Sequence, residues 1–276
     1  MFEQTPLGAS RSSADLAAGA ARRPKTLVIN NQKGGVGKTM LAVHLAWYLA
    51  ETGERVLFVD LDPQANGSWT LSAARVGESS GLFFGPTPST TARPGLSLLA
   101  GSSALDSVDS RLVSAVGVFR EAFPILAAGF DYVVIDTPPT WGGRNYAALM
   151  VASSLLAPID LETYALQGVK QLMAQKAAVE RGARQGQPID FLGLLPSRFQ
   201  SQSPRQRASL AELLRHQGLQ IMFPGYSVIT QRQGYAEALE LKAPVWTIRK
   251  TAAQEAGREI RGVLARIKSR LDGLPA

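Results

Sequence analysis

The stretch that decides the fold is TLVINNQKGGVGKTMLAVHLAWYLA, residues 26–50. Its first four residues, Thr26–Ile29, are β-branched or apolar, which predicts a buried strand. Its last part carries apolar residues at helical spacing, namely Ala42, Leu45, Ala46 and Leu49. The segment between them is rich in glycine. A strand, a glycine loop and a helix in this order are the context that a phosphate-binding loop needs.

The loop itself has the residue types that bind phosphate. Glycines let the backbone curl so that successive N–H groups face one oxyanion, and the start of the helix adds partial positive charge. Lys38 can neutralise the β- and γ-phosphates, and the Thr39 hydroxyl can bind Mg²⁺. The residues expected to contact ATP here are Lys33, Gly34, Gly35, Val36, Gly37, Lys38, Thr39 and Met40. The alternative, a glycine-rich turn with two solvated lysines, does not account for the flanking strand and helix.

The loop departs from the general pattern G-x-x-x-x-G-K-[ST], because Gln32 stands where that pattern has its first glycine. It reads Lys-Gly-Gly-Val-Gly-Lys-Thr, with a second lysine, Lys33, at its mouth. This segment resembles the deviant Walker A motif of the ParA/MinD family of ATPases. The resemblance implies that Lys33 reaches the phosphate bound by a partner subunit, so that ATP stabilises a homodimer.

Two further apolar runs end in aspartate. Residues 56–59 precede Asp60 and Asp62, which would share one face of a strand that Pro63 ends. Residues 132–135 precede Asp136, as in a Walker B motif. Carboxylates beside a phosphate loop suit Mg²⁺ binding and water positioning. Turn-forming aspartates are the alternative, but the three motifs occur in the order that a P-loop ATPase requires.

The residues around these aspartates resemble the two switch regions of the ParA family. Residues 60–66, Asp-Leu-Asp-Pro-Gln-Ala-Asn, are similar to switch I, and Thr-Pro-Pro at 137–139 is similar to switch II. The resemblance implies catalytic roles for Asp62, Lys33 and Lys38, with Asp62 positioning or activating the attacking water. It implies a metal site made by Thr39, Asp60 and Asp136. Gly142 and Gly143 are expected to give the second loop freedom to respond to the γ-phosphate.

Later segments are expected near the nucleotide base and the dimer interface. The predicted strand 189–196 leads to Pro196 and Arg198, candidates for adenine contact, whereas Phe199 could equally be a core residue. Residues 227–238 resemble the family's I-P-R-N-x-x-x-x-E-A segment, with Thr230 in place of proline. Residues 158–168 resemble its P-x-x-x-E-x-x-x-x-x-G block, which lines the dimer interface in the family.

The net charge of +7 lies in the last part of the chain. Residues 1–197 hold 16 Lys and Arg against 16 Asp and Glu, whereas residues 198–276 hold 13 against 6. A basic face of this kind suits a polyanion such as DNA, and a solvated helical surface is the alternative. The residues expected to bind DNA are Arg205, Arg207, Arg232 and Lys250.

Composition restricts the remaining function classes. The absence of cysteine excludes disulfides, cysteine-ligated zinc and Fe–S clusters, and is consistent with a reducing cytosol. No run of 18 apolar residues and no signal-peptide core occur, so we expect a cytoplasmic protein without stable membrane association. The resemblance to the ParA family implies that it associates with the nucleoid. The predicted C-terminal helix, 252–271, carries an apolar stripe that packs on the sheet or, alternatively, binds a membrane surface as in MinD.

Alternating strands and helices predict an α/β fold, a mainly parallel twisted sheet with helices on both faces and nucleotide at the carboxyl ends of the strands. We expect a flexible tail over 1–24 and a single domain over 25–276. The resemblance, over about residues 25–270, implies an ATP-dependent partition ATPase that binds DNA non-specifically and is stimulated by a ParB-like centromere-binding protein. The alternatives are a MinD-like or cargo-positioning ATPase, and a metabolic ligase, for which the sequence offers no second group of substrate-binding residues.

Overall fold

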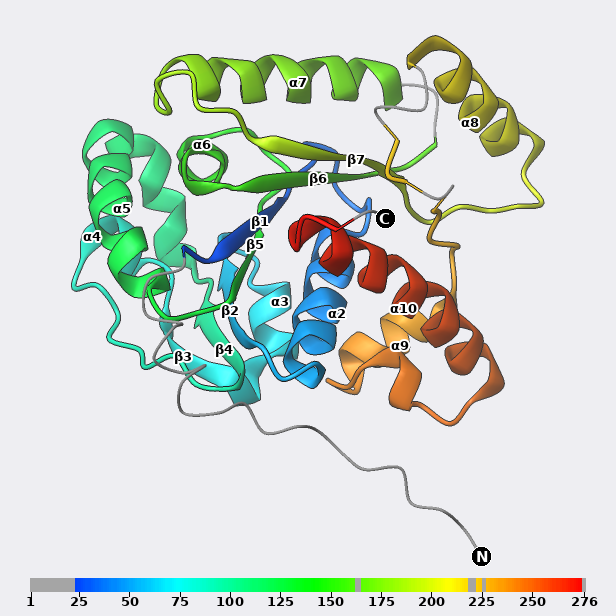
Figure 1. Cartoon of the computed structure of the whole chain (residues 1–276), viewed down its shortest axis with the longest axis horizontal. Coiled ribbons are helices and arrows are strands. Elements are labelled where there is room, and N and C mark those ends of the chain that lie inside the picture. The colour runs from blue at the N-terminus through cyan, green and yellow to red at the C-terminus, as the bar shows by residue number, and fades with distance from the viewer. Residues whose placement is uncertain (1–22, 162–164, 218–221, 225–226, 275–276) are drawn as a thin grey trace, which may run out of the picture.

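The computed structural model describes residues 23–161, 165–217, 222–224 and 227–274. The expected N-terminal tail lies almost entirely outside these residues. Seven parallel strands form one sheet in the order β3-β4-β2-β5-β1-β6-β7 (Figure 1). The strands are β1 (Lys25–Ile29), β2 (Arg55–Asp60), β3 (Arg75–Glu78), β4 (Gly95–Ala100), β5 (Tyr132–Asp136), β6 (Ser154–Ile159) and β7 (Asp190–Pro196). The predicted fold class is confirmed.

Helices cover both faces of this sheet (Figure 1). They are α2 (Lys38–Glu51), α3 (Asn66–Thr70), α4 (Gly81–Phe84), α5 (Leu112–Ala127), α6 (Gly143–Val151), α7 (Ala165–Arg181), α8 (Pro204–Gln217), α9 (Gln233–Glu240) and α10 (Thr251–Leu271). Short 3-10 helices span Ser72–Ala74, Ser103–Arg111 and Val245–Thr247.

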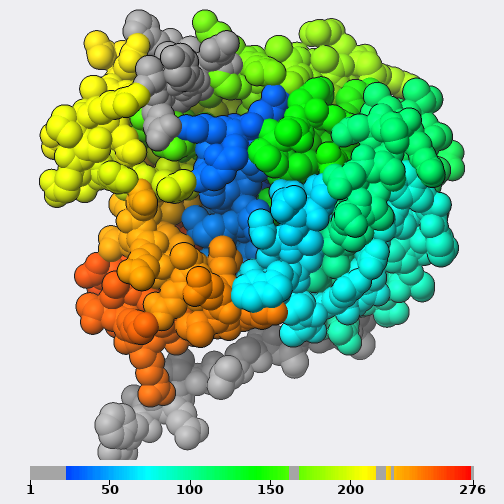
Figure 2. Space-filling model, turned by 180° about the vertical axis from the view of Figure 1, so that it is seen from behind, coloured from blue at the N-terminus to red at the C-terminus, as the bar shows by residue number. Residues whose placement is uncertain are grey.

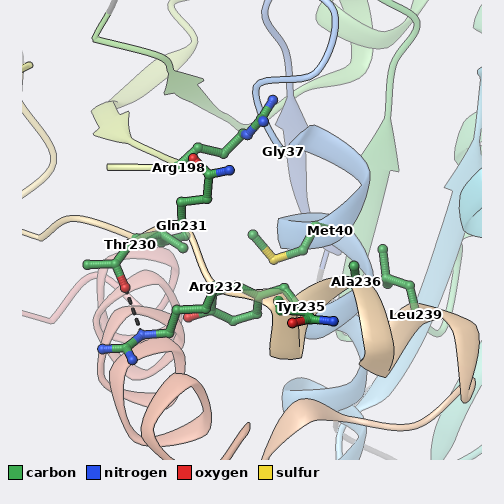
Figure 3. A pocket seen from close by; sticks show the side chains of 11 residues that line it. Gly37, Met40, Arg198, Thr230, Gln231, Arg232, Tyr235, Ala236 and Leu239 are labelled. Carbon is green, nitrogen blue, oxygen red and sulfur yellow. Dashed lines mark hydrogen bonds between the residues drawn. The ribbon is translucent and has the colours of Figure 1, made fainter. Parts of the chain in front are cut away.

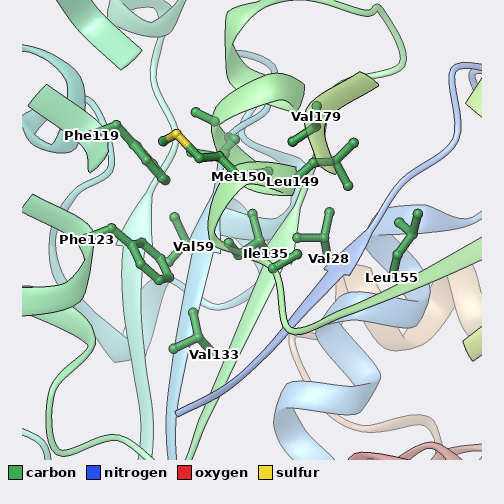
Figure 4. Close-up of a cluster of buried hydrophobic side chains, with 14 of the residues drawn as sticks. Val28, Val59, Phe119, Phe123, Val133, Ile135, Leu149, Met150, Leu155 and Val179 are labelled. Carbon is green, nitrogen blue, oxygen red and sulfur yellow. The ribbon is translucent and has the colours of Figure 1, made fainter. Parts of the chain in front are cut away.

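The two faces follow from the alternation of side chains along the strands. Val28 lies in a core with residues of α4, α5, α6 and α7, part of which Figure 4 shows. Its neighbours Leu27 and Ile29 lie in a second core with α2, α9 and α10. Because the strands are buried on both faces, their sequences are continuously apolar.

The strand register brings three functional segments to one edge. Asp60 of β2 lies opposite Asp136 of β5, and Ile29 of β1 lies opposite Asp136 on the other side. The loop that follows β1 and the two aspartate motifs therefore meet at the carboxyl ends of the central strands. This is the edge where α/β sheets bind ligands.

Two expectations for residues 75–127 were wrong in detail. Glycines and prolines between Gly81 and Gly101 predict an irregular segment over 75–110 with one short strand over 96–100, but the segment contains β3 and α4 besides β4. β3 is a four-residue edge strand with two exposed residues, so it lacks the apolar run that reveals a buried strand. The sequence also predicts a helix over about 107–127; this region begins as the 3-10 helix Ser103–Arg111, and α5 starts at Leu112.

The glycines after switch II are closely packed. A Cβ atom at Gly142 would lie 2.5 Å from Asp109 Oδ1, and one at Gly143 would lie 2.7 Å from Leu112 Cδ1. Asp109 Oδ1 accepts the Gly143 N–H at 2.6 Å at the start of α6, two residues before Asn145, where the sequence pattern predicts a helix to begin. These glycines permit close packing against the 3-10 helix and α5.

The C-terminal helix packs on the sheet, as predicted. The apolar stripe of α10 is buried in the second core; its residues are Ile260, Val263, Leu264, Ile267 and Leu271. In the described part of the chain, no helix has the length and hydrophobicity to cross a membrane.

Candidate nucleotide site

The phosphate-binding loop joins β1 to α2 with backbone geometry that only glycine adopts easily. Gly37 precedes α2 with φ of 88°, and a Cβ atom there would lie 2.8 Å from Ser197 Oγ. The Lys38 ammonium donates to the Lys33 carbonyl oxygen at 3.1 Å, and Lys38 is only 7% exposed. The lysine thus folds back over the loop, where a bound phosphate would lie.

Burial lowers the pKa of Lys38, whereas the carboxylates of Asp136 and Asp62 oppose this shift. Burial also raises the pKa of Asp136 well above its usual value, and the neighbouring Asp60 carboxylate adds to that effect. Neither carboxylate oxygen of Asp136 has a hydrogen-bond partner among the described residues. A buried carboxylate without a hydrogen-bond partner at this position can bind a cation, either directly or through the water molecules around that cation.

Asp60 is buried in the same place but is occupied by hydrogen bonds. Its Oδ2 accepts from the Ser68 N–H at 2.8 Å and from the Ser68 hydroxyl at 2.6 Å, and its Oδ1 accepts from the Asp62 N–H at 3.0 Å. Burial raises the pKa of Asp60 to about 6, although these hydrogen bonds oppose the rise. Asp60 thereby holds the switch I loop and α3 in place. Sequence reasoning missed Ser68, whose position after switch I carried no recognised signal.

The residues present fit Mg²⁺, which binds few protein ligands directly and retains water. Thr39 is the second residue of α2, and its side chain lies close enough to Asp136 to oppose the rise in the pKa of that carboxyl. Within the described residues no cluster of three or more His, Cys, Asp or Glu side chains could hold a metal by itself. Bound Mg²⁺ would be held by Thr39 and Asp136, and would supply charge to neutralise phosphate oxygens.

Asp62 stands at the turn after β2, partly exposed. Its Oδ1 accepts the Gln64 N–H at 3.0 Å, which fixes the start of the switch I loop. Asp62 is close enough to act on the pKa of both Lys38 and Asp136. The two sequence motifs are therefore brought together beside the P-loop.

The mouth of the P-loop is attached to the end of β6 and to α7. Lys33 forms an ion pair with Asp160 at 3.4 Å, Asn31 Nδ2 donates to the Pro158 carbonyl at 2.8 Å, and Gln32 hydrogen-bonds Gln175. Lys33 is about half exposed. Sequence comparison with the family gave no indication of the pairing with Asp160. Residues 162–164 of the family block, and the Gln167 side chain, lie outside the described part.

Beside the P-loop is a cavity of about 410 Å³. It lies between the start of α2 and a wall formed by residues 229–239, and Figure 3 shows its lining. The lining residues are Gly37, Met40, Arg198, Ile229, Thr230, Gln231, Arg232, Gln233, Tyr235, Ala236 and Leu239. A mostly apolar cavity with a few polar side chains, adjoining a phosphate loop, suits a nucleoside.

The predicted base contacts differ in where they lie. Arg198 and Met40 line the cavity, and Arg198 Nη1 donates to the Gly35 carbonyl at 2.9 Å. Pro196 is buried and its carbonyl accepts the Ile229 N–H at 2.8 Å, so it supports the wall and does not line the cavity. Phe199 is half-buried and packs against the first core.

The four predicted DNA-binding residues fall into two groups. Arg205 and Arg207 lie on α8, are exposed, and form no ion pair within the described residues. Arg232 pairs with Glu255 at 2.9 Å and lines the cavity, and Lys250 pairs with Glu237. α8 and α9 flank the same side of the P-loop in the space-filling view (Figure 2). Among the described residues, Arg205 and Arg207 therefore have no ion-pair partner, whereas Arg232 and Lys250 are already paired.

Comparisons with known proteins identify relatives of this chain. A family model described as an AAA domain matches residues 24–186. Protein IncC of Escherichia coli is 38% identical over 252 residues, which cover 87% of this chain and 68% of IncC. The chain belongs to the ParA/MinD family of P-loop ATPases. The chromosome-partitioning ATPase Soj of Thermus thermophilus is 33% identical over 216 residues, covering 78% of this chain and 84% of Soj.

Solved structures extend the likeness over most of this ParA/MinD-family chain. Apo McdA of Cyanothece has a TM-score of 0.71 at 25% identity, covering 87% of this chain and 99% of McdA. Cobyrinic acid a,c-diamide synthase of Mycobacterium smegmatis, with a bound ATP analogue and magnesium, has a TM-score of 0.68 at 25% identity. It covers 90% of this chain and 97% of the synthase. The fold is therefore shared with McdA and with this synthase.

Proposed function

We propose that this chain is a partition ATPase that binds ATP and Mg²⁺, dimerises on ATP and binds DNA without sequence preference. The observation that carries the proposal is the convergence of a P-loop lysine and two buried carboxylates at one sheet edge, in which Asp136 has no hydrogen-bond partner among the described residues. Its relatives IncC, Soj and ParA support a role in partition and not in metabolism.

Different residues of the site bind the nucleotide and promote its hydrolysis. Lys38 and the loop N–H groups bind the phosphates, because the loop and the helix start concentrate positive charge there. Mg²⁺, when bound, neutralises phosphate oxygens beside Thr39 and Asp136. Asp62 positions the attacking water, and Asp60 supports it through the hydrogen bond from the Asp62 N–H to Asp60 Oδ1. The cavity beside Met40 and Arg198 accepts the base.

The position of Lys33 supports the proposal that the chain dimerises on ATP. Its ammonium lies at the exposed mouth of the loop, from which it can reach a phosphate on a second copy. In the dimer, two copies of α8 would present their exposed arginines together. Non-specific DNA binding then results from phosphate neutralisation and depends strongly on salt. A ParB-like partner would stimulate hydrolysis, which is slow without it, and the protein would act on the nucleoid in the cytoplasm.

The test compares DNA binding and oligomeric state of the full chain with ATP, with ADP and without nucleotide. We expect a dimer only with ATP, and DNA affinity at least about tenfold higher in that state, since two basic faces bind together. Lys33→Ala should keep nucleotide binding but lose the dimer, whereas Lys170→Ala, an exposed lysine on α7, should behave as wild type. Equal DNA affinity in all three states would refute the proposal.

The membrane alternative can be examined in the same samples. The apolar stripe of α10 is buried in the second core, so a membrane-binding α10 would have to leave the sheet. Co-sedimentation with anionic vesicles in the presence of ATP, with no DNA binding, would favour a MinD-like function instead.

A further inference from the structure

One partly buried carboxylate outside the P-loop has several partners in the wall of the nucleotide cavity. Glu259, on α10, accepts hydrogen bonds from the Thr230 N–H at 2.9 Å and from the Thr230 hydroxyl at 2.6 Å. It also accepts from the Tyr235 hydroxyl at 2.9 Å. Its side chain is 19% exposed, and the Arg232 guanidinium lies 3.7 Å away.

The three partners are residues that line the cavity. Thr230, Arg232 and Tyr235 all belong to the wall, and Figure 3 shows the Arg232 guanidinium turned toward Thr230, where Nε donates to the hydroxyl at 2.8 Å. The Tyr235 ring is 5% exposed, and burial followed by the Glu259 charge raises the pKa of its hydroxyl. The hydroxyl therefore remains protonated and keeps donating to the carboxylate.

The opposite side of the wall is held by the end of β7. The Ile229 N–H donates to the Pro196 carbonyl at 2.8 Å, and the Phe199 N–H donates to the Ile229 carbonyl at 2.9 Å. The wall is thus fixed between β7, which lies against the P-loop at Gly37, and α10. Thr230 stands where the family's segment has proline, which has no N–H and no hydroxyl. The two hydrogen bonds from Thr230 to Glu259 depend on this substitution.

We propose that Glu259 is a positioning residue for the nucleotide: it holds the wall of residues 229–235 at the distance from α2 that the nucleoside requires. The inference rests on the proposed function, because it assumes that the cavity receives the base of ATP. Glu259 does not touch the nucleotide. It acts through Thr230 and Tyr235, and it links the geometry of the cavity to α10.

The test separates the nucleoside from the phosphates. Affinities of the full chain for ATP and for Mg²⁺-tripolyphosphate, which has no base, are measured by calorimetry. Glu259→Ala should weaken ATP binding about tenfold, as expected for the loss of charged hydrogen bonds, and change tripolyphosphate binding less than about twofold. Thr230→Val, which keeps the shape but removes the hydroxyl, should weaken ATP binding about threefold in the same selective way.

The control is Glu255→Ala, one turn earlier on α10. Glu255 pairs with Arg232 at the surface and makes no hydrogen bond with Thr230 or Tyr235, so ATP affinity should stay within about twofold of wild type. The proposal is overturned if Glu259→Ala and Thr230→Val bind ATP as wild type does. It is also overturned if both ligands are weakened equally, which indicates general damage. A wild-type chain that binds neither ligand would overturn the proposed function itself.

Discussion

Lys38, Asp60 and Asp136 are ionisable groups that lie in a place with little water. Burial favours the neutral form of each group: it lowers the pKa of the lysine and raises the pKa of the two acids. Burying such groups lowers the free energy of unfolding of the empty protein. Binding of phosphate and a cation offsets this loss. We therefore expect binding of ATP and Mg²⁺ at this edge of the sheet to raise the free energy of unfolding of the chain.

Lys38→Ala removes the buried cation. We expect ATP affinity to fall by about 100-fold or more, because a charged hydrogen bond to phosphate contributes roughly 3 kcal/mol. The free energy of unfolding without nucleotide should not decrease, since a partly desolvated charge is removed. Calorimetric titration with ATP and Mg²⁺ measures the affinity, with Lys170→Ala as the matched control. Wild-type affinity for ATP in Lys38→Ala would contradict the assignment of residues 33–39 as the phosphate-binding loop.

Asp62→Ala removes the carboxylate proposed to position water. We expect ATP and DNA binding to persist while turnover falls by about 100-fold or more, the usual contribution of a positioned acid or base. Steady-state phosphate release in the presence of DNA is the measurement. Asp190→Ala, at the start of β7 and therefore at the opposite edge of the sheet, is the control. Unchanged turnover in Asp62→Ala would assign catalysis to another residue.

Among the elements, α10 is attached to the cavity wall near its middle and to the sheet at its end. Glu259 holds the wall, and Asp272 accepts hydrogen bonds from Lys25 of β1, Tyr132 of β5 and Lys268. Burial alone would raise the pKa of Asp272, but these hydrogen bonds outweigh it and lower the pKa to about 2. The charged carboxylate therefore stabilises the attachment of α10.

Asp272→Asn should lower the free energy of unfolding at pH 7 by about 1 kcal/mol, after allowance for solvent screening at a partly exposed site. The folded-state pKa lies below the ordinary value of 3.8, so this stabilisation is present above pH 4 and is lost as the pH falls toward 2. Urea unfolding of both proteins at several pH values measures it. A difference that stays constant from pH 7 to pH 2 would contradict the assignment, and Asp190→Asn serves as the exposed control.

Over the whole molecule, the basic excess of the C-terminal third is partly neutralised by folding. Arg261 pairs with Glu51, Lys268 with Glu54 and Arg270 with Asp190, all acids from the earlier, electrically balanced part of the chain. Arg205 and Arg207 on α8 keep exposed, unpaired charges among the described residues. α8 is therefore the element best suited to contact DNA.

Replacing both Arg205 and Arg207 by alanine should weaken DNA binding in the ATP state and reduce the slope of log affinity against log salt by about 2 to 4, for a dimer with four fewer cations. ATP affinity should not change. A double variant of Arg120 and Arg181, exposed residues of α5 and α7, removes the same charge as the control. Wild-type affinity and slope in the α8 variant would place the DNA surface elsewhere.

Local pattern was sufficient to predict the strand, loop and helix of the P-loop, the two aspartate strands and the apolar stripe of α10. Each is a short-range feature, because burial on both faces requires a continuous apolar run and a phosphate loop requires glycines before a lysine. The three motifs also placed Lys38, Asp60 and Asp136 at one edge, since parallel strands bring their carboxyl ends together.

Only the tertiary structure decided which of these groups already have partners. The hydrogen bonds from Ser68 to Asp60, the pairing of Lys33 with Asp160, and the contacts of Glu259 with Thr230 join residues of different elements, up to 127 positions apart. The charges of Arg232 and Lys250, counted toward a DNA surface from the sequence, are paired in the fold. Net charge is a sum over residues, whereas the charge available to a ligand depends on which acids the fold brings beside each base.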